Sequence, residues 1–133
     1  MNTNISSNFA LICDLAFFGE GGKLSIIGIF KNINGKTLPL QHPQMFVVSS
    51  ILIKGSGNYK KVIKLIRARD GVEIIAPLEF NLAVKGENEA EFGVLGQLTN
   101  IKFEEAGLYE VQIFVNSELI KKLPLIITVI QQP

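Results

Sequence analysis

The amino-acid sequence predicts an all-β fold, an antiparallel β-sandwich of about eight strands. Apolar residues make up 47% of the chain, and they include 18 isoleucines and 9 valines against 7 alanines. β-Branched side chains favour the pleated strand over the helix interior. The apolar runs are short and are separated by glycine, proline and asparagine, as is typical of antiparallel strands and their turns. At 133 residues the chain has the length of one domain, which we expect to cover residues 1–133.

The expected strands follow the apolar runs in order. Residues 9–18 and 23–31 are expected to form a hairpin, because the glycines at 19, 21 and 22 permit the positive φ angles of a tight connection. A long loop over Asn32 to Gln44, with Asn34-Gly35 and two prolines, then leads to a third strand. The third and later strands are expected at 45–54, 59–69, 79–85, 90–103, 108–116 and 118–130.

Residues 59–69 fit two patterns. Val62, Ile63, Leu65 and Ile66 suit a helical stripe about as well as a strand. The strand is favoured because Asp70-Gly71 follows and an apolar run resumes at 72–75, which is the pattern of a type I′ hairpin.

The last strand contains a proline. Pro124 has no N–H to donate to a neighbouring strand, so it favours a sheet edge or a bulge at that point. Around it, Leu123, Leu125, Ile127 and Val129 alternate and are expected to point the same way.

The segment from Glu105 to Val111 contains Gly107-Leu108-Tyr109 and is followed by strict alternation of apolar residues. It resembles the tyrosine corner of immunoglobulin-like sandwiches, where a tyrosine at the start of a strand hydrogen-bonds to the backbone of the preceding loop. Val111 stands where antibody domains place a cysteine, and the chain has one cysteine and no tryptophan. We therefore expect an immunoglobulin-like sandwich that lacks the core disulfide and tryptophan of antibody domains.

Further landmarks recur in a fixed order along the chain. They are Cys13-Asp14, Gly22-Lys23-Leu24 with Gly28, Pro39 and Pro43, Asp70-Gly71, Gly107-Leu108-Tyr109 and Pro124-Leu125. In this order the chain resembles a family of small, uncharacterised bacterial β-sandwich proteins, a domain of unknown function. The resemblance implies an immunoglobulin-like sandwich over nearly all of the chain and implies no activity.

The net charge and the number of cysteines indicate which partners the protein attracts and in which cellular compartment it is found. The net charge of +1 gives no overall field to attract nucleic acid or an anionic membrane. No apolar stretch reaches the ~18 residues of a membrane span, and the N-terminus lacks the basic start of a signal peptide. One cysteine cannot form an intramolecular disulfide, so we expect a cytoplasmic protein.

We expect no enzyme, because a nucleophile needs a base and His42 is the one histidine of the chain. Cys13 lies in the middle of the first expected strand and is interpreted as a buried thiol that packs like a small hydrophobic side chain. Asp14 is interpreted as a solvated carboxylate, or as a buried one that accepts backbone N–H bonds.

We also expect no cofactor. A zinc site needs about four nitrogen or sulfur ligands, and this chain offers one cysteine and one histidine. Glu87, Glu89 and Glu91 could hold calcium, but a solvated hairpin tip is the favoured interpretation. The glycines form neither of the common nucleotide-binding patterns.

Two segments supply weak binding candidates. His42 lies in a loop stiffened by Pro39 and Pro43, which is interpreted as a connection between the sheets rather than a recognition surface. Residues 54–69 hold six of the thirteen basic residues. A protected, solvated sheet edge is favoured there over a basic stripe for RNA. The candidate binding residues are Lys60, Lys61, Lys64, Arg67 and His42.

The sequence is therefore interpreted as a non-catalytic binding or assembly module whose partner is unknown. The alternative is a nucleic-acid-binding protein that uses the basic stripe, and a hydrolase comes third. The apolar content exceeds what two sheets can hide, so we also expect an exposed apolar patch and self-association, most simply as a homodimer. The residues expected to contribute are Phe17, Phe18, Leu108, Phe114, Ile126 and Ile130.

Overall fold

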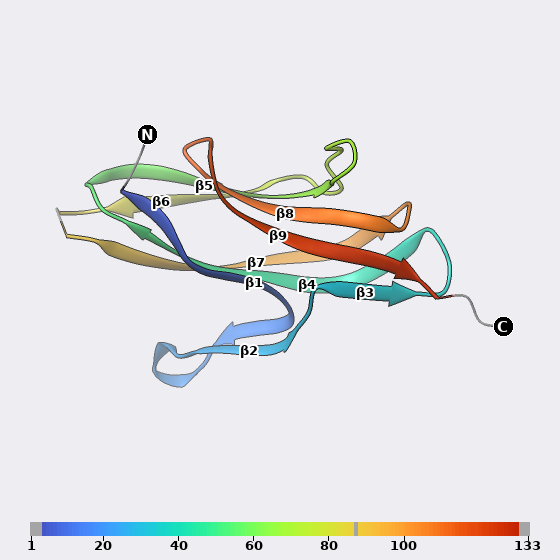
Figure 1. Cartoon of the computed structure of the whole chain (residues 1–133). Coiled ribbons are helices and arrows are strands. Elements are labelled where there is room, and N and C mark those ends of the chain that lie inside the picture. Colours follow the sequence, from blue (N-terminus) through green and yellow to red (C-terminus); the bar gives the residue numbers. More distant parts are fainter. Residues whose placement is uncertain (1–3, 87, 131–133) are drawn as a thin grey trace.

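The computed structural model describes residues 4–86 and 88–130. Within these residues nine β-strands form two sheets, and the all-β prediction is confirmed (Figure 1). The strands are β1 (Ile5–Phe18), β2 (Leu24–Ile29), β3 (Asn32–Gly35), β4 (Leu40–Ile53), β5 (Gly57–Arg67), β6 (Leu78–Val84), β7 (Ala90–Phe103), β8 (Gly107–Val115) and β9 (Glu118–Val129).

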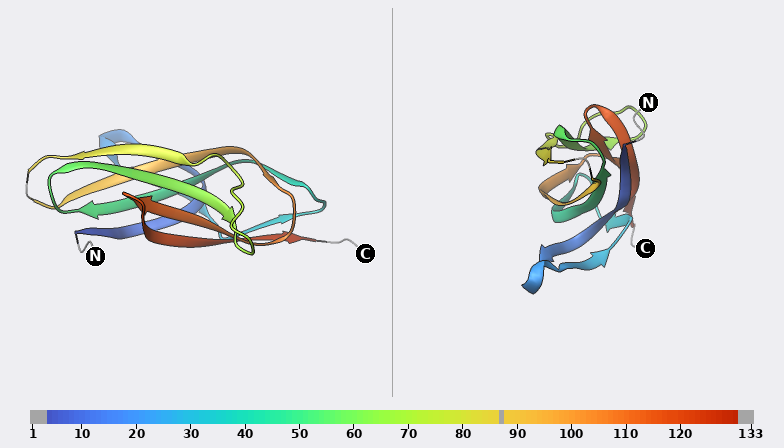
Figure 2. Two further views of the ribbon diagram at one scale, coloured as in Figure 1. Left: turned by 90° about the horizontal axis from the view of Figure 1, so that it is seen from above. Right: turned by 90° about the vertical axis from the view of Figure 1, so that its left-hand side faces the viewer.

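The four-stranded sheet has the order β2-β1-β4-β7 and the five-stranded sheet the order β3-β9-β8-β5-β6. Neighbouring strands are antiparallel, as predicted, except that β3 runs parallel to β9. Seen from above, the long strands of both sheets run along the length of the molecule (Figure 2). The predicted hairpin at residues 9–31 is confirmed, with a single 3₁₀ turn at Glu20–Gly22 between β1 and β2.

The predicted long loop over Asn32 to Gln44 is wrong at both ends. Asn32–Gly35 forms β3, and Asn32 pairs with Ile126 of β9. The next strand already begins at Leu40, so His42 lies within β4 opposite Ile101 and not in a loop. β3 is hard to predict because two of its four residues are asparagine and its partner strand lies at the other end of the chain.

Residues 59–69 are essentially a strand, as predicted, but β5 is not a sheet edge. β5 pairs with β6 on one side and with β8 on the other. The type I′ hairpin predicted at Asp70-Gly71 is also wrong, because Gly71 has a positive φ of 76° and Asp70 does not. The chain turns back after Arg67, and before β6 it pairs with β5 through an isolated bridge between Ile66 and Glu73.

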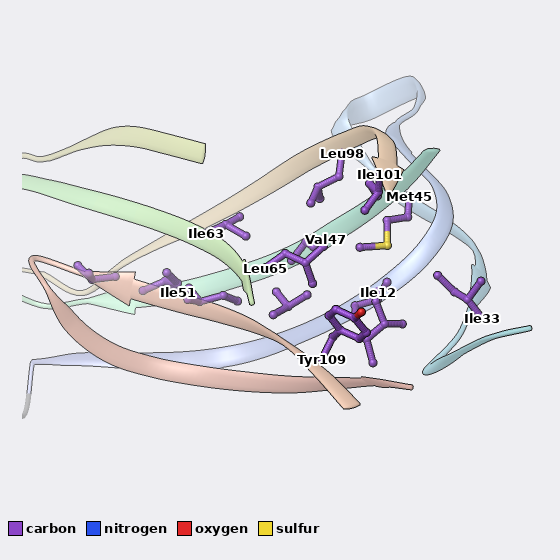
Figure 3. Packing of buried hydrophobic residues seen from close by; sticks show 14 of the residues in the cluster. Ile12, Ile33, Met45, Val47, Ile51, Ile63, Leu65, Leu98, Ile101 and Tyr109 are labelled. Carbon is purple, nitrogen blue, oxygen red and sulfur yellow. The ribbon is translucent and has the colours of Figure 1, made fainter. Parts of the chain in front are cut away.

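Alternate residues of the long strands fill the space between the sheets (Figure 3). Tyr109, Val111, Ile113 and Val115 of β8 are all buried and share one face, as their alternation predicts. Pro124 of β9 pairs with Glu110 of β8 on one side, while the pairing of β9 with β3 on the other side begins only at Ile126. The side of β9 that faces β3 is therefore a local edge at Pro124, in agreement with the prediction.

A second buried cluster lies on the opposite face of the four-stranded sheet. It contains Cys13, Ala16, Phe46 and Val48, and Phe46 and Val48 alternate along β4 with residues of the main core. β1 curves strongly, and the hairpin that it forms with β2 lies apart from the rest of the molecule (Figure 1). Cys13 is fully buried, as predicted, and burial raises the pKa of its thiol.

Tyr109 makes the predicted corner contact. Its hydroxyl donates a hydrogen bond of 2.7 Å to the carbonyl of Glu105, and its side chain is fully buried. Tyr59 repeats this arrangement at the start of β5, where it donates to the carbonyl of Gly55 at 2.8 Å. In both places a glycine with a positive φ angle, Gly107 or Gly57, stands two residues before the tyrosine and lets the chain turn sharply into the strand.

Replacing Tyr109 with phenylalanine should lower the free energy of unfolding by about 1 kcal/mol or more, because the Glu105 carbonyl loses its buried donor. Tyr59→Phe should cost less, since Tyr59 is only partly buried. Urea-induced unfolding of both variants measures the two costs. An unchanged midpoint for Tyr109→Phe contradicts a stabilising role of this hydrogen bond.

Candidate functional site

The basic residues of β5 lie on opposite faces of the strand. Lys61 points between the sheets and is fully buried, so it belongs neither to the solvated edge that the sequence favoured nor to the alternative basic stripe. Its ammonium donates a hydrogen bond to the hydroxyl of Ser49 in β4 and so links the two sheets. Burial lowers the pKa of Lys61 to about 8. The strand alternation could have revealed this position, because Lys61 is in phase with the buried residues Ile63 and Leu65.

Lys60 and Lys64 lie on the outer face of β5 and line an open groove of about 660 Å³. The ammonium of Lys60 is 2.9 Å from a carboxylate oxygen of Glu79, and that of Lys64 is 3.7 Å from Glu73. The ammonium of Lys64 also lies over the ring of Phe114, 5.1 Å from its centre, and Phe114 is another of the residues that line the groove. Each lysine of this groove is thus balanced by a carboxylate, which leaves little free positive charge for a polyanion.

Arg67 belongs to an ion-pair network at the end of β5. Its guanidinium lies 2.8 Å from Asp70 and 3.6 Å from Glu105. Arg69 also binds Glu105, with 2.9 Å between Nη2 and Oε2. The hydrogen bonds from Arg67 hold the pKa of Asp70 down to about 2. This network joins the turn after β5 to the loop before β8. The Glu105 carbonyl of that loop accepts the hydrogen bond from the Tyr109 hydroxyl.

His42 lies in β4, which belongs to the other sheet than β5 and its basic residues. Its side chain lines a polar hollow of about 310 Å³. The hollow is lined by Asp14, Gly28, Ile29, Phe30, Asn32, Ile33, Asn34 and His42. The ring of His42 meets Phe30 edge-on, with 5.9 Å between the ring centres. Burial lowers the pKa of His42, although nearby Asp14 and a backbone hydrogen bond to Gln44 act in the opposite direction. The imidazole is therefore neutral at pH 7.

The sequence does not predict this hollow. Asp14 and His42 are far apart along the chain, and the pairing of Cys13 in β1 with Phe46 in β4 brings them to the same hollow. No local pattern of the sequence reports that register. Thus the five candidate residues fall in separate places: Lys60 and Lys64 share the groove, while Lys61, Arg67 and His42 lie in three other environments.

The hairpin tip predicted around residues 87–91 is wrong, because β6 ends at Val84, β7 begins at Ala90, and the two strands belong to different sheets. Glu87 lies outside the described residues. Glu91 accepts hydrogen bonds of 2.6 Å from both Ser50 and Asn8, which lower its pKa.

Within residues 4–86 and 88–130, no cluster of three or more His, Cys, Asp or Glu side chains is placed to hold a metal ion. No helix in the same residues is long and apolar enough to cross a membrane.

Exposed apolar side chains gather on the β1–β2 hairpin. Leu15 and Phe17 of β1 are exposed, as are Ile27 and Ile29 of β2, whose exposed fractions are 53% and 62%. Leu15 pairs directly with Ile27 across the hairpin. We call these four residues the hairpin apolar face. Phe18, Leu108, Ile126 and Ile130 are also exposed, as the sequence suggested, whereas Phe114 is half-buried.

Comparison with known proteins gives a family but no activity. Among solved structures, the chain is similar to part of the Pseudomonas fluorescens alkylpurine DNA glycosylase AlkC bound to DNA containing an abasic site analog, with a TM-score of 0.49, 7% identity, and coverage of 94% of this chain and 30% of that one. It is also similar to part of a β-glucosidase from Listeria innocua in complex with isofagomine, with a TM-score of 0.49, 17% identity, and coverage of 75% of this chain and 15% of that one. The chain therefore spans less than a third of either protein.

No curated protein matches the sequence. A family profile does match, over residues 8–128, and it describes a family of unknown function, DUF6941. Because this match covers most of the sequence, the chain belongs to the family of unknown function DUF6941.

Proposed function

We propose that the protein is a non-catalytic assembly module that associates with a second copy of itself through the β1–β2 hairpin. The observation that carries the proposal is the hairpin apolar face, where Leu15, Phe17, Ile27 and Ile29 are exposed together. With roughly 100 Å² exposed on each of these side chains, the face measures on the order of 400 Å², the size of the largest apolar patches that monomers tolerate.

The position of β2 supports a second copy as the partner. β2 is the first strand of its sheet and pairs only with β1, so its other edge has free backbone donors and acceptors in the described part of the chain. If two β2 edges pair antiparallel about Ile27, the Ser25 of one copy lies opposite Ile29 of the other, and the outward side chains stay on one face. The two faces then lie side by side on one continuous sheet as an apolar surface on the order of 800 Å², and the edge contact itself has the small area of a weak and reversible dimer.

The test measures mass in solution by light scattering at increasing protein concentration. The wild-type chain should be a dimer at high micromolar concentration, and the double variant Phe17→Thr/Ile27→Thr should be a monomer with an unchanged far-UV spectrum. The matched control is Leu108→Thr/Ile126→Thr, which removes another exposed apolar pair and should leave the dimer intact. A wild-type monomer at high micromolar concentration, or a hairpin variant that remains a dimer, overturns the proposal.

We also propose that the fold is an immunoglobulin-like sandwich and that the protein is cytoplasmic. Support for an immunoglobulin-like sandwich comes from the hydrogen bond between Tyr109 and Glu105 at the start of β8, which is the contact of a tyrosine corner. Support for a cytoplasmic protein comes from the single cysteine, Cys13, which is free and buried.

A further inference from the structure

The hollow around His42 lies at the base of the β1–β2 hairpin, beside the hairpin apolar face, with which it shares only Ile29. Asp14 comes from β1, Gly28 from β2, Asn32 and Asn34 from β3, and His42 from β4, so four strands converge on it. Such convergence of polar side chains from separate strands is typical of a ligand site.

Asp14 is the one carboxylate among the residues that line the hollow, and the lining contains neither lysine nor arginine. Neither a hydrogen bond nor an ion pair to its carboxylate is found among residues 4–86 and 88–130. Gly28 leaves room for the carboxylate, since a Cβ atom there would overlap the Asp14 Oδ2 atom, and its φ angle of 71° also favours glycine. The hollow therefore presents a carboxylate that forms no ion pair with a cation of the described residues.

The rest of the lining also suits a positive ligand. The Nδ2 group of Asn32 donates to Oδ1 of Asn34 at 2.5 Å, so these two amides form a preset pair at the rim. The Nε2 atom of His42 is buried and has no hydrogen-bond partner among the described residues. Phe30 contributes an aromatic ring, which attracts cations through its negative face. Because this lining lacks a cluster of three metal-ligating side chains, an organic cation fits it better than a metal ion.

We propose that this hollow binds a small organic cation that carries an ammonium or guanidinium group. Asp14 forms the charge-assisted hydrogen bonds with the ligand nitrogen. Phe30 packs against the alkyl or guanidinium part, and the side-chain amides of Asn32 and Asn34 set the size of the entrance.

The test is a titration of the full-length, isotope-labelled protein with agmatine, which carries both an ammonium and a guanidinium group. The Gly28 backbone amide and the Asn32 and Asn34 side-chain amides should shift in a saturable way in two-dimensional NMR spectra. Asp14→Asn keeps the shape of the side chain and should weaken binding about tenfold, because the charge-assisted contact is lost. Glu20→Gln removes a carboxylate from the same hairpin, outside the hollow, and should change the affinity less than about twofold.

Two further arms make the outcome decisive. Acetate, an anion of similar simplicity, should cause no saturable shift. Phe30→Leu should weaken agmatine binding about threefold, and it serves as the second variant if Asp14→Asn does not fold. The proposal is overturned if agmatine causes no saturable shift at these residues, if Glu20→Gln weakens binding as much as Asp14→Asn, or if Zn²⁺ binds there and agmatine does not.

Discussion

Replacing Lys61 with methionine should stabilise the protein at pH 7 by about 2 kcal/mol. Lys61 is fully buried, and burial lowers its pKa from 10.5 to about 8. The difference between these two values corresponds to about 3 kcal/mol of unfavourable free energy for the protonated, buried form. Methionine removes this cost and fills a similar volume. The loss of the hydrogen bond to Ser49 offsets about 1 kcal/mol of the gain.

The same substitution should remove a pH dependence of stability. The pKa of Lys61 is lower in the folded state than in the unfolded state, so the unfolded chain binds more protons between about pH 8 and pH 10.5. The Lys61 contribution to the free energy of unfolding therefore rises with pH through this window and is constant below it. Urea-induced unfolding at pH 7, 8, 9 and 10 measures the difference between wild type and Lys61→Met, in which all other titrating groups cancel.

Lys60→Met is the matched control, because Lys60 is the neighbouring residue but its side chain is exposed and paired with Glu79. It should leave both the stability at pH 7 and its pH dependence nearly unchanged. If Lys61→Met is less stable than wild type at pH 7, or if the difference between the two proteins does not narrow as the pH rises, the buried charge is not a cost to folding.

The position of Lys61 illustrates which parts of the structure could be predicted. The strand at residues 90–103 and the burial of alternate residues along β8 follow from apolar alternation, which is a local property of the sequence. The same alternation assigns Lys61 to the inner face with Ile63 and Leu65. Counting basic residues within 54–69 ignores the two faces of a strand, and it therefore treats Lys61 as a solvated residue although it is fully buried.

The candidate site required information that no local pattern holds. That Asp14 and His42 lie near each other depends on the register of β1 against β4, and the hollow is also lined by β3, whose partner β9 lies at the other end of the chain. Pairings of this kind depend on side-chain packing across the whole sheet. The glycines that shape the hollow and the two tyrosine contacts are visible in the sequence as residues, but their φ angles follow from the completed fold.

Truncating Phe103 to alanine should have the largest effect on stability, a loss of about 3–5 kcal/mol. Phe103 is the last residue of β7, is fully buried, and meets Tyr109 edge-on with 4.9 Å between the ring centres. Removing the ring leaves a cavity beside the same tyrosine whose hydroxyl fixes the loop before β8. Phe18→Ala is the matched control, since Phe18 is 54% exposed and its truncation should cost less than about 1 kcal/mol.

A double-mutant cycle then tests whether the ring and the hydroxyl act together. If the contact with Phe103 holds Tyr109 in position for its hydrogen bond to Glu105, the cost of Tyr109→Phe should shrink by at least about 0.5 kcal/mol when Phe103 is already alanine. Phe103→Leu provides a milder background if the alanine variant does not fold. Additive costs in either background would mean that the two contacts stabilise the corner independently, and equal costs for Phe103→Ala and Phe18→Ala would contradict the central place of Phe103 in the core.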